Sequence, residues 1–331
     1  MVTIFTKKRR MQEILTDPQM EPYASYFVSK MDLTQHPIYQ MTIEEISENR
    51  LFHGYSLLDG INRLWEGLQD GRVYYPLYSE EEVKQDPKKG EAFFLYFPSM
   101  DPGASEKPFV VVVPGGGNVQ LWNMTEGFPI AGHFNKLGYH AVVLNYRVGG
   151  PALYPAPLED MAQLLRDIDR HQGELGLKSG RYFTVGFSAG GYLVNCWSAA
   201  AHGYQTYQLP KPEMNISVYG FTSWKHVREG WNIEEFAETT HGLSIKEIAQ
   251  TDWNVEESVS TFPLTYILHG DDDHACDVLN SQVLADALKN AGIPHVLELG
   301  KGTDHGFGEG YFTPLRGWIE RAVNYYEESV K

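Results

Sequence analysis

The amino-acid sequence predicts an α/β protein with a mostly parallel central sheet that helices cover on both faces. Short runs of almost entirely apolar residues alternate with longer segments in which apolar side chains recur every three or four positions. Unbroken apolar strands are typical of sheets buried on both faces, and their alternation with helices is typical of parallel βαβ units. The chain has 331 residues, 42% of them hydrophobic, which is enough for a large core.

The first 90 residues carry the weakest pattern. Apolar spacing between 41 and 68 predicts one or two helices, whereas the polar stretch 79–91, with Pro87 and Gly90, predicts a loop. We therefore expect residues 1–90 to form a partly helical N-terminal extension and residues 91–331 to form the main domain.

From residue 92 on, the order of elements becomes regular. Runs rich in β-branched and aromatic residues predict strands at 92–98, 109–114, 141–148, 182–188, 216–221, 263–270 and 295–300. One-sided apolar spacing predicts helices at 158–176, directly after residue 188, at 278–292 and at 317–329. Residues 222–260 interrupt this order with acidic helical segments that contain Trp224, Trp231 and Trp253, and we expect them to form a lid.

Charge and cysteine content limit the partners. The net charge is −16, opposite to the basic surface that nucleic acids or anionic membranes require. We find no secretory signal and no run of 18 apolar residues. Cys196 and Cys276 offer neither a disulfide framework nor a CxxC metal motif. We expect a soluble protein of the cytoplasm, although a secreted chain that had lost its signal would look the same.

The sharpest chemical signal is GFSAG at 186–190, between a predicted strand and a predicted helix. The pattern GxSxG in this setting predicts a nucleophile elbow, a turn so tight that only small neighbours fit around an exposed serine. The N-terminus of the following helix points at that serine, here Ser188. A glycine-rich turn with a capping serine is the structural alternative.

A serine hydroxyl becomes a strong nucleophile when an imidazole takes its proton and a carboxylate orients the imidazole. His305 follows the last predicted strand in KGTDHGFG, and a histidine in such a loop can reach the elbow. LHGDDDHACDV at 268–278 supplies Asp271, Asp272 and Asp273, and the pattern alone leaves the choice among them open. Binding of a divalent metal by this acidic segment is a less favoured interpretation. We expect neither a metal nor a cofactor.

The sequence PGGG at 114–117 closes the strand 109–114. Backbone N–H groups of such a loop, together with the amide of Ala189, can stabilise the negative charge that develops on a carbonyl oxygen in acyl transfer. The glycine spacing fits neither GxGxxG nor GxxxxGK[ST], so a phosphate-binding loop is a weaker interpretation. A purely structural turn is the remaining alternative. Asn118 and Trp122 are candidate substrate contacts, although Trp122 can equally pack in the core.

Taken in order, these motifs resemble the α/β-hydrolase superfamily, and more narrowly the bacterial esterase branch related to hormone-sensitive lipase, acetyl-xylan esterases and feruloyl esterases. The likeness covers about residues 90–331 and rests on PGGG (114–117), LNYRV (144–148) with the helix after it, GFSAGG (186–191), HGDDDHACDV (269–278) and DHGFG (304–308). It implies an α/β-hydrolase fold. In this family the acid follows an HGxxD pattern and the histidine precedes GF, which implies a triad of Ser188, Asp273 and His305. The resemblance also implies oxyanion donors at Gly116, Gly117 and Ala189.

The chain departs from many relatives at two positions. Pro114 stands where they carry a histidine, and Asn118 stands where many carbohydrate-deacetylating members carry an aromatic residue. We expect a serine carboxylesterase that acts on a small-molecule ester, with an acetyl or aromatic acyl group and a carbohydrate among the candidate alcohols. The alternatives are a serine peptidase or acyltransferase of the same fold and a non-catalytic ligand-binding protein. The N-terminal extension is a candidate arm for a homo-oligomer.

Overall fold

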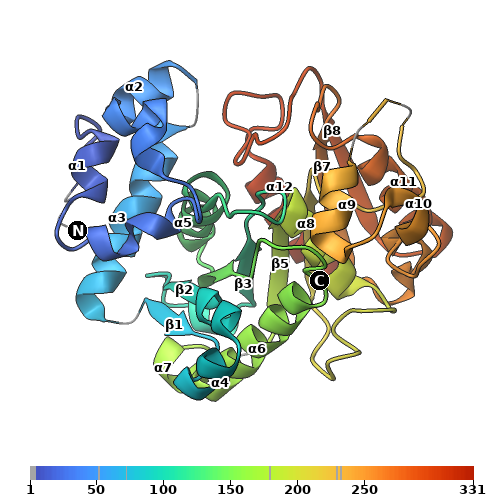
Figure 1. Ribbon diagram of the computed structural model, residues 1–331. Coiled ribbons are helices and arrows are strands. Elements are labelled where there is room, and N and C mark those ends of the chain that lie inside the picture. The colour runs from blue at the N-terminus through green and yellow to red at the C-terminus, as the bar shows by residue number, and fades with distance from the viewer. Residues whose placement is uncertain (1–4, 51–52, 72, 179, 229, 232) are drawn as a thin grey trace.

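The computed structural model describes residues 5–50, 53–71, 73–178, 180–228, 230–231 and 233–331. Within these residues, eight strands form one sheet in the order β1-β2-β4-β3-β5-β6-β7-β8 (Figure 1). The strands are β1 (Tyr74–Pro76), β2 (Phe93–Phe97), β3 (Phe109–Val113), β4 (Ala141–Asn145), β5 (Tyr182–Phe187), β6 (Met214–Val218), β7 (Leu264–Gly270) and β8 (His295–Gly300).

The sheet is parallel except at one end. β1 pairs with β2 and β2 with β4 in antiparallel fashion, and every pairing from β4 to β8 is parallel. The mostly parallel sheet predicted from the sequence is thereby confirmed. Because the carboxyl ends of parallel strands share one edge, the loops that follow β3, β5, β7 and β8 meet at that edge.

Two hydrophobic cores lie on the two faces of the sheet. Within β3, Val110 and Val112 belong to one core and Val111 and Val113 to the other, as the two-residue period of a strand requires. The first core includes side chains of α1 (Met11–Leu15), α2 (Ile43–Glu48), α3 (Gly54–Asp70), α5 (Phe128–Lys136) and α12 (Trp318–Ser329). The second includes side chains of α6 (Ala156–Arg170), α8 (Ala189–Ser198) and α11 (Leu279–Asn290).

The N-terminal helices share the first core with the sheet. Ile14 and Phe27 are fully buried in the same cluster as Phe128 of α5, and α3 lies against α5. β1 precedes residue 90 and pairs with β2, so the sheet begins within the segment predicted as an extension. None of the helices in the described part of the chain combines the length and the hydropathy that a membrane crossing requires.

Three local predictions were wrong. The strand predicted at 141–148 ends at Asn145. The stretch 79–91, expected as a loop, forms α4 (Glu80–Gln85) and the turn η4 (Pro87–Glu91). Ser79 and Glu82 cap α4 reciprocally, an S-x-x-E signature present in the sequence. The strand predicted at 216–221 ends instead at Val218, because Tyr219 turns to a φ of 41°, outside the extended conformation of a strand.

The segment between β6 and β7 contains α9 (Glu234–His241), α10 (Ile245–Ile248) and the short turns η7 (Val255–Glu257) and η8 (Val259–Thr261). It overlaps the range predicted as a lid. The short helix α7 (Gln172–Leu175) follows α6 after one residue, His171.

Candidate active site

Ser188 stands at the sharp turn between β5 and α8, at the edge of the sheet where the carboxyl ends of the parallel strands meet. Its φ of 52° and ψ of −116° lie outside the regions that non-glycine residues ordinarily populate. The turn is held by close packing on both sides of the serine. A Cβ on Gly186 would lie 2.3 Å from the carbonyl oxygen of Gly190, and a Cβ on Gly190 would lie 2.2 Å from that of Val113. These two positions therefore accommodate glycine and no residue with a Cβ.

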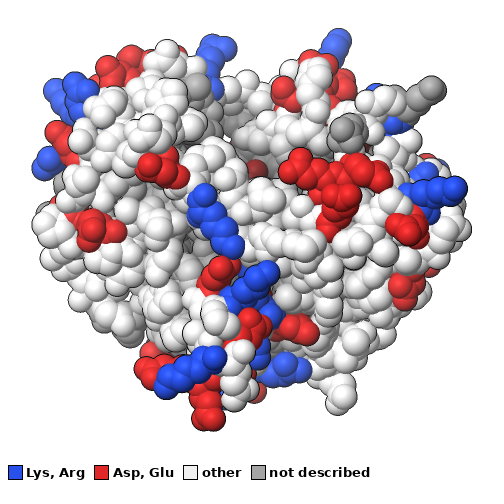
Figure 2. Space-filling view, viewed as in Figure 1, with Lys and Arg blue, Asp and Glu red and all other residues white. Residues whose placement is uncertain are grey.

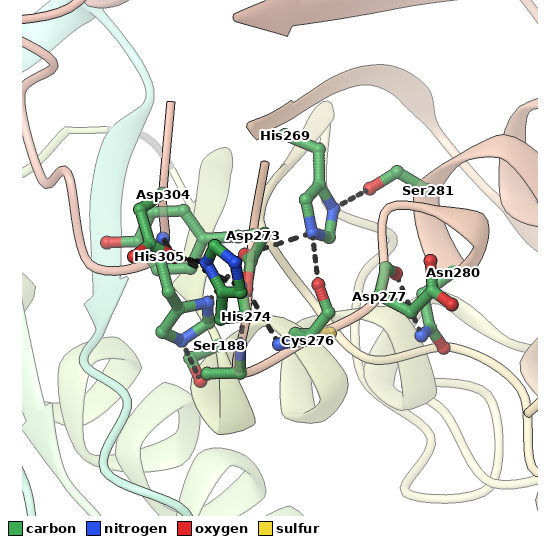
Figure 3. A network of polar contacts seen from close by, with 12 residues as sticks. Ser188, His269, Asp273, His274, Cys276, Asp277, Asn280, Ser281, Asp304 and His305 are labelled. Carbon is green, nitrogen blue, oxygen red and sulfur yellow. Dashed lines mark hydrogen bonds and ion pairs between the residues drawn. The ribbon is translucent and has the colours of Figure 1, made fainter. Parts of the chain in front are cut away.

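His305 connects Ser188 to Asp273 (Figure 3). Its Nε2 lies 2.9 Å from the Oγ of Ser188, and its Nδ1 lies 2.7 Å from the Oδ2 of Asp273. Asp273 follows β7, and His305 follows β8. Of the three consecutive aspartates, Asp271 instead accepts a hydrogen bond from the N–H of Gly302, and the side chain of Asp272 is 67% exposed.

Asp273 is fixed from several sides. Its Oδ1 accepts the N–H groups of Ala275 at 2.8 Å and Cys276 at 2.7 Å. Its Oδ2 also lies 3.2 Å from the Nε2 of His269. Burial would raise the pKa of this carboxyl, but the hydrogen bonds from His269, His305 and Cys276 more than offset burial and hold the pKa well below its ordinary range. Asp273 is therefore a carboxylate across the neutral pH range.

His269 is one site neighbour that the sequence reasoning missed. It is completely buried, and the hydroxyl of Ser281 lies 2.6 Å from its Nδ1. With the Ser281 hydroxyl donating to Nδ1, the Nε2–H faces Asp273 and the carbonyl of Cys276. The only signal for this residue was the histidine of the HGDDD motif itself.

The PGGG loop passes beside Ser188. Gly116 has a φ of 139° and Gly117 a φ of 64°, both in the region that favours glycine. A Cβ on Gly116 would lie 2.1 Å from the carbonyl oxygen of Gln120. Neither amide has a hydrogen-bond acceptor in the part of the chain that the structure describes. The amide of Ala189, the first residue of α8, is one of the N–H groups that a helix start leaves without an intrahelical partner.

Ser188, His305, Gly116, Gly117 and Ala189 line one cavity of about 740 Å³. This volume lies within the range of small-molecule sites. Further lining comes from the loop after β3 and from the segment between β6 and β7, and includes Gln120, Trp122, Thr125, Phe221, Ile233, Glu235 and Phe236. Figure 2 shows acidic side chains gathered over α9, the helix that supplies Glu235 and Phe236.

The two candidate substrate contacts have different positions. Trp122 lines the cavity. Asn118 does not: it is completely buried, with a φ of 61°, and its Nδ2 donates to the Oγ1 of Thr240 at 2.9 Å. Its side chain connects the glycine loop to α9, so the structure corrects the expectation that it meets substrate.

A buried carboxyl beside Ser188 was also missed. Glu126 lines the cavity, is 5% exposed, and accepts hydrogen bonds from the N–H of Gly115 and the hydroxyl of Tyr219. Burial raises its pKa. No short motif pointed to it, because its partners lie far apart in the chain.

The family profile of BD-FAE matches residues 95–288, more than half of the chain. The protein belongs to the BD-FAE family. The matched range contains the glycine loop, the serine elbow and Asp273, while the N-terminal helices lie outside it.

Two curated proteins resemble this BD-FAE member over part of their length. An acetylxylan esterase of Xylanibacter ruminicola is 29% identical over 209 residues, which are 61% of this chain and 41% of that protein. Endo-1,4-beta-xylanase B of Butyrivibrio fibrisolvens is 26% identical over 195 residues, 56% of this chain and 30% of that protein. The chain therefore spans less than half the length of these relatives.

Solved structures share the fold. An acetyl ester-xyloside bifunctional hydrolase from Caldicellulosiruptor lactoaceticus superposes with a TM-score of 0.60 at 24% identity, covering 77% of this chain and 94% of that one. The carboxylesterase Cest-2923 from Lactobacillus plantarum gives a TM-score of 0.57 at 18% identity, covering 72% and 92%. The BD-FAE member thus has the α/β-hydrolase fold that the sequence motifs implied.

Proposed function

We propose that the protein hydrolyses carboxylic esters through an acyl-serine intermediate. The observation that carries this proposal is the continuous hydrogen-bonded line from Ser188 through His305 to Asp273 at the wall of a cavity. Membership of the BD-FAE family supports it, as do relatives named as an acetylxylan esterase and a carboxylesterase.

In the first step, Ser188 attacks the ester carbonyl while Nε2 of His305 takes the hydroxyl proton. Asp273 accepts the Nδ1–H of His305, which keeps Nε2 unprotonated before the attack and stabilises the imidazolium afterwards. The amides of Gly116, Gly117 and Ala189 are the donors for the oxyanion, and one such donor contributes a factor of about 10² to 10³ in kcat.

His305 then gives its proton to the leaving alkoxide, and the acyl group stays on Ser188. A water molecule that loses a proton to the same Nε2 attacks the acyl-serine, and collapse of the second tetrahedral species returns the proton to Ser188. Each proton taken up by His305 is released again, so the site returns to its starting state.

The two parts of the ester are assigned to different walls of the cavity. Phe221, Ile233 and Phe236 form an apolar wall, which suits the acyl group. The alcohol belongs near His305, because this residue must protonate it. We propose that the segment 222–260, which supplies Ile233 and Phe236, acts as a lid over the acyl side.

A second cavity of about 230 Å³ shares His305 with the first and extends toward the N-terminal helices. Figure 2 shows a hollow between these helices and the segment after β8. The lining includes Arg50, His53, Tyr311 and the 41% exposed Phe312. The guanidinium of Arg50, the ring nitrogens of His53 and the hydroxyl of Tyr311 are groups that can hydrogen-bond to hydroxyl groups, which supports a carbohydrate as the alcohol. The N-terminal extension would then contribute to the alcohol side.

The cellular compartment is proposed from the cysteines. Cys196 and Cys276 are both free and buried, which supports a reducing compartment such as the cytoplasm. Association of two copies through the N-terminal helices stays a prediction.

The proposed function is tested with a panel of acetyl, feruloyl and longer acyl esters, including an acetylated xylo-oligosaccharide, with Ser188→Ala as the blank. We expect hydrolysis by the wild type, none by the variant, and labelling of Ser188 by a fluorophosphonate probe. Cleavage of aminoacyl amides in preference to all esters would indicate a peptidase. Absence of both labelling and turnover in folded protein would indicate a ligand-binding protein and contradict the proposal.

A further inference from the structure

A buried carboxyl lies between the glycine loop and the rest of the site. Glu126 is part of a single π-helical turn, η6 (Asn123–Gly127), which precedes α5. Single π-turns within helical segments are frequent at functional sites, because the extra residue changes the direction of the side chains. Here Glu126 faces the cavity, and its Oε2 accepts the N–H of Gly115 at 2.7 Å. Gly115 directly precedes the two glycines proposed as oxyanion donors.

The second oxygen of this carboxyl leads to the catalytic-histidine loop. Oε1 of Glu126 accepts the hydroxyl of Tyr219 at 2.8 Å, and the oxygen of that hydroxyl accepts the N–H of Gly308 at 3.2 Å. The ring of Tyr219 lies 4.6 Å from that of His305, centroid to centroid. Four groups from three parts of the chain therefore form one hydrogen-bonded line: Gly115, Glu126, Tyr219 and Gly308.

Tyr219 has an unusual backbone conformation. Its φ of 41° is rare for a bulky residue, and the side chain is completely buried. Such conformations persist where the surroundings fix them and are concentrated at active sites. The strained turn at the end of β6 is what aims the hydroxyl at Glu126.

We infer that Glu126 and Tyr219 are positioning residues that hold the glycine loop and the His305 loop in one fixed relation. Both loops carry catalytic groups on irregular backbone, and such groups must be held within about 0.5 Å of the productive geometry. The two oxygens of one side chain accept donors from two separate segments, Gly115 of the glycine loop and Tyr219 at the end of β6, so one side chain links both. The inference rests on the proposed function, because it assigns the bridge to ester hydrolysis.

The inference is tested with two single variants and their combination. Glu126→Gln keeps the shape but places an amide donor opposite the Tyr219 hydroxyl, whose proton then loses its acceptor. Tyr219→Phe removes only the hydroxyl and keeps the ring beside His305. The matched control is Tyr182→Phe, at the opposite end of the parallel strands. The Tyr182 hydroxyl, like that of Tyr219, donates one hydrogen bond, to the carbonyl of Pro210 at 2.7 Å, and accepts one, from the indole N–H of Trp197 at 3.0 Å.

Kinetics are measured with p-nitrophenyl acetate, together with the rate of Ser188 labelling by a fluorophosphonate and the thermal midpoint of every variant. Loss of a whole oxyanion donor costs about 10²- to 10³-fold in kcat, so a displaced loop should cost about 10- to 100-fold for Glu126→Gln and about 10-fold for Tyr219→Phe. KM should change by less than about 3-fold for Tyr219→Phe, because Tyr219 does not line the cavity, whereas Glu126 does and its replacement can also change KM. The double variant should be no slower than the slower single variant, since both act through one bridge.

The outcomes separate this inference from the proposed function. If the wild type is active and both Glu126→Gln and Tyr219→Phe stay within about 2-fold of Tyr182→Phe in kcat and labelling rate, the inference about the bridge is wrong and the proposed function stands. A wild type that labels but does not hydrolyse p-nitrophenyl acetate leaves the labelling rates as the test of the bridge. A wild type that neither hydrolyses esters nor labels overturns both. If Glu126→Gln does not fold, Tyr219→Phe decides.

Discussion

Replacement of Asp273 by asparagine removes one negative charge and leaves the shape of the site unchanged. The orientation of the new amide follows from the structure. In the wild type, one carboxylate oxygen accepts the N–H groups of Ala275 and Cys276, and an amide can serve those two donors only with its carbonyl oxygen. The amide nitrogen must therefore take the place of Oδ2 and point at the Nδ1 of His305.

This orientation reverses the tautomer of the imidazole. With an N–H donor opposite, Nδ1 of His305 becomes the acceptor, and Nε2 carries the proton toward Ser188. An imidazole in that state cannot take the proton of the serine. The same change in a serine protease triad lowers kcat by about 10⁴-fold, equivalent to about 5 kcal/mol of activation free energy. We expect a loss of this size for Asp273→Asn.

The assay is steady-state hydrolysis of p-nitrophenyl acetate by wild type, Asp273→Asn and Asp272→Asn. The neighbouring Asp272 is a matched control, because its side chain is 67% exposed and it carries the same charge one residue away. We expect Asp272→Asn to stay within about 2-fold of the wild type. Retention of more than about a tenth of the activity in Asp273→Asn, or an equal loss in Asp272→Asn, would refute the tautomer argument.

Three further predictions concern the elbow, the histidine loop and the acyl wall. Gly190→Ala should lower kcat by about 100-fold or prevent folding, because its Cβ would lie 2.2 Å from a backbone oxygen. Gly173→Ala is the control and should leave kcat unchanged, because a Cβ on Gly173 meets no atom within 4 Å. Kinetics and thermal midpoints check both variants. Burial raises the pKa of Glu309, but the hydrogen bond with His133 and the nearby His53 more than offset burial and lower the pKa from 4.5 to about 2. Glu309 therefore contributes about 3 kcal/mol to the free energy of unfolding above pH 4.5, and this contribution is lost as the pH falls toward 2. Urea unfolding should therefore show that Glu309→Gln is less stable than the wild type at pH 7 and that the difference in free energy of unfolding between the two disappears in acid. A difference that does not change with pH would contradict this. Phe236→Ala should raise kcat/KM for butyrate relative to acetate by about 10-fold, and an unchanged ratio would remove Phe236 from the acyl wall.

The fold and the central line of the site could be predicted because each left a local mark in the sequence. Apolar strands alternate with helices, and Ser188 and His305 each follow a strand in a short glycine-containing motif. Strand ends of a parallel sheet share one edge, so order along the chain translated into proximity in space.

Other features depend on tertiary contacts and left no such mark. Which aspartate meets His305 is decided by the turn after β7, where the amides of Ala275 and Cys276 fix Asp273. Glu126 and Tyr219 are 93 residues apart and meet only across the packed sheet edge. Asn118, expected at the substrate, is drawn instead to Thr240 of α9, a partner that only the folded chain brings near.

The central claim is that Ser188 carries the acyl group during turnover. Wild-type protein mixed with excess p-nitrophenyl acetate, quenched in acid within the first turnovers and digested, would be analysed by mass spectrometry with Asp273→Asn alongside. The account predicts an acetyl group on the peptide that contains Ser188, formed with a burst of nitrophenolate in the wild type and far more slowly in the variant. Acetyl transfer to another residue, or turnover by Ser188→Ala at the wild-type rate, would contradict it.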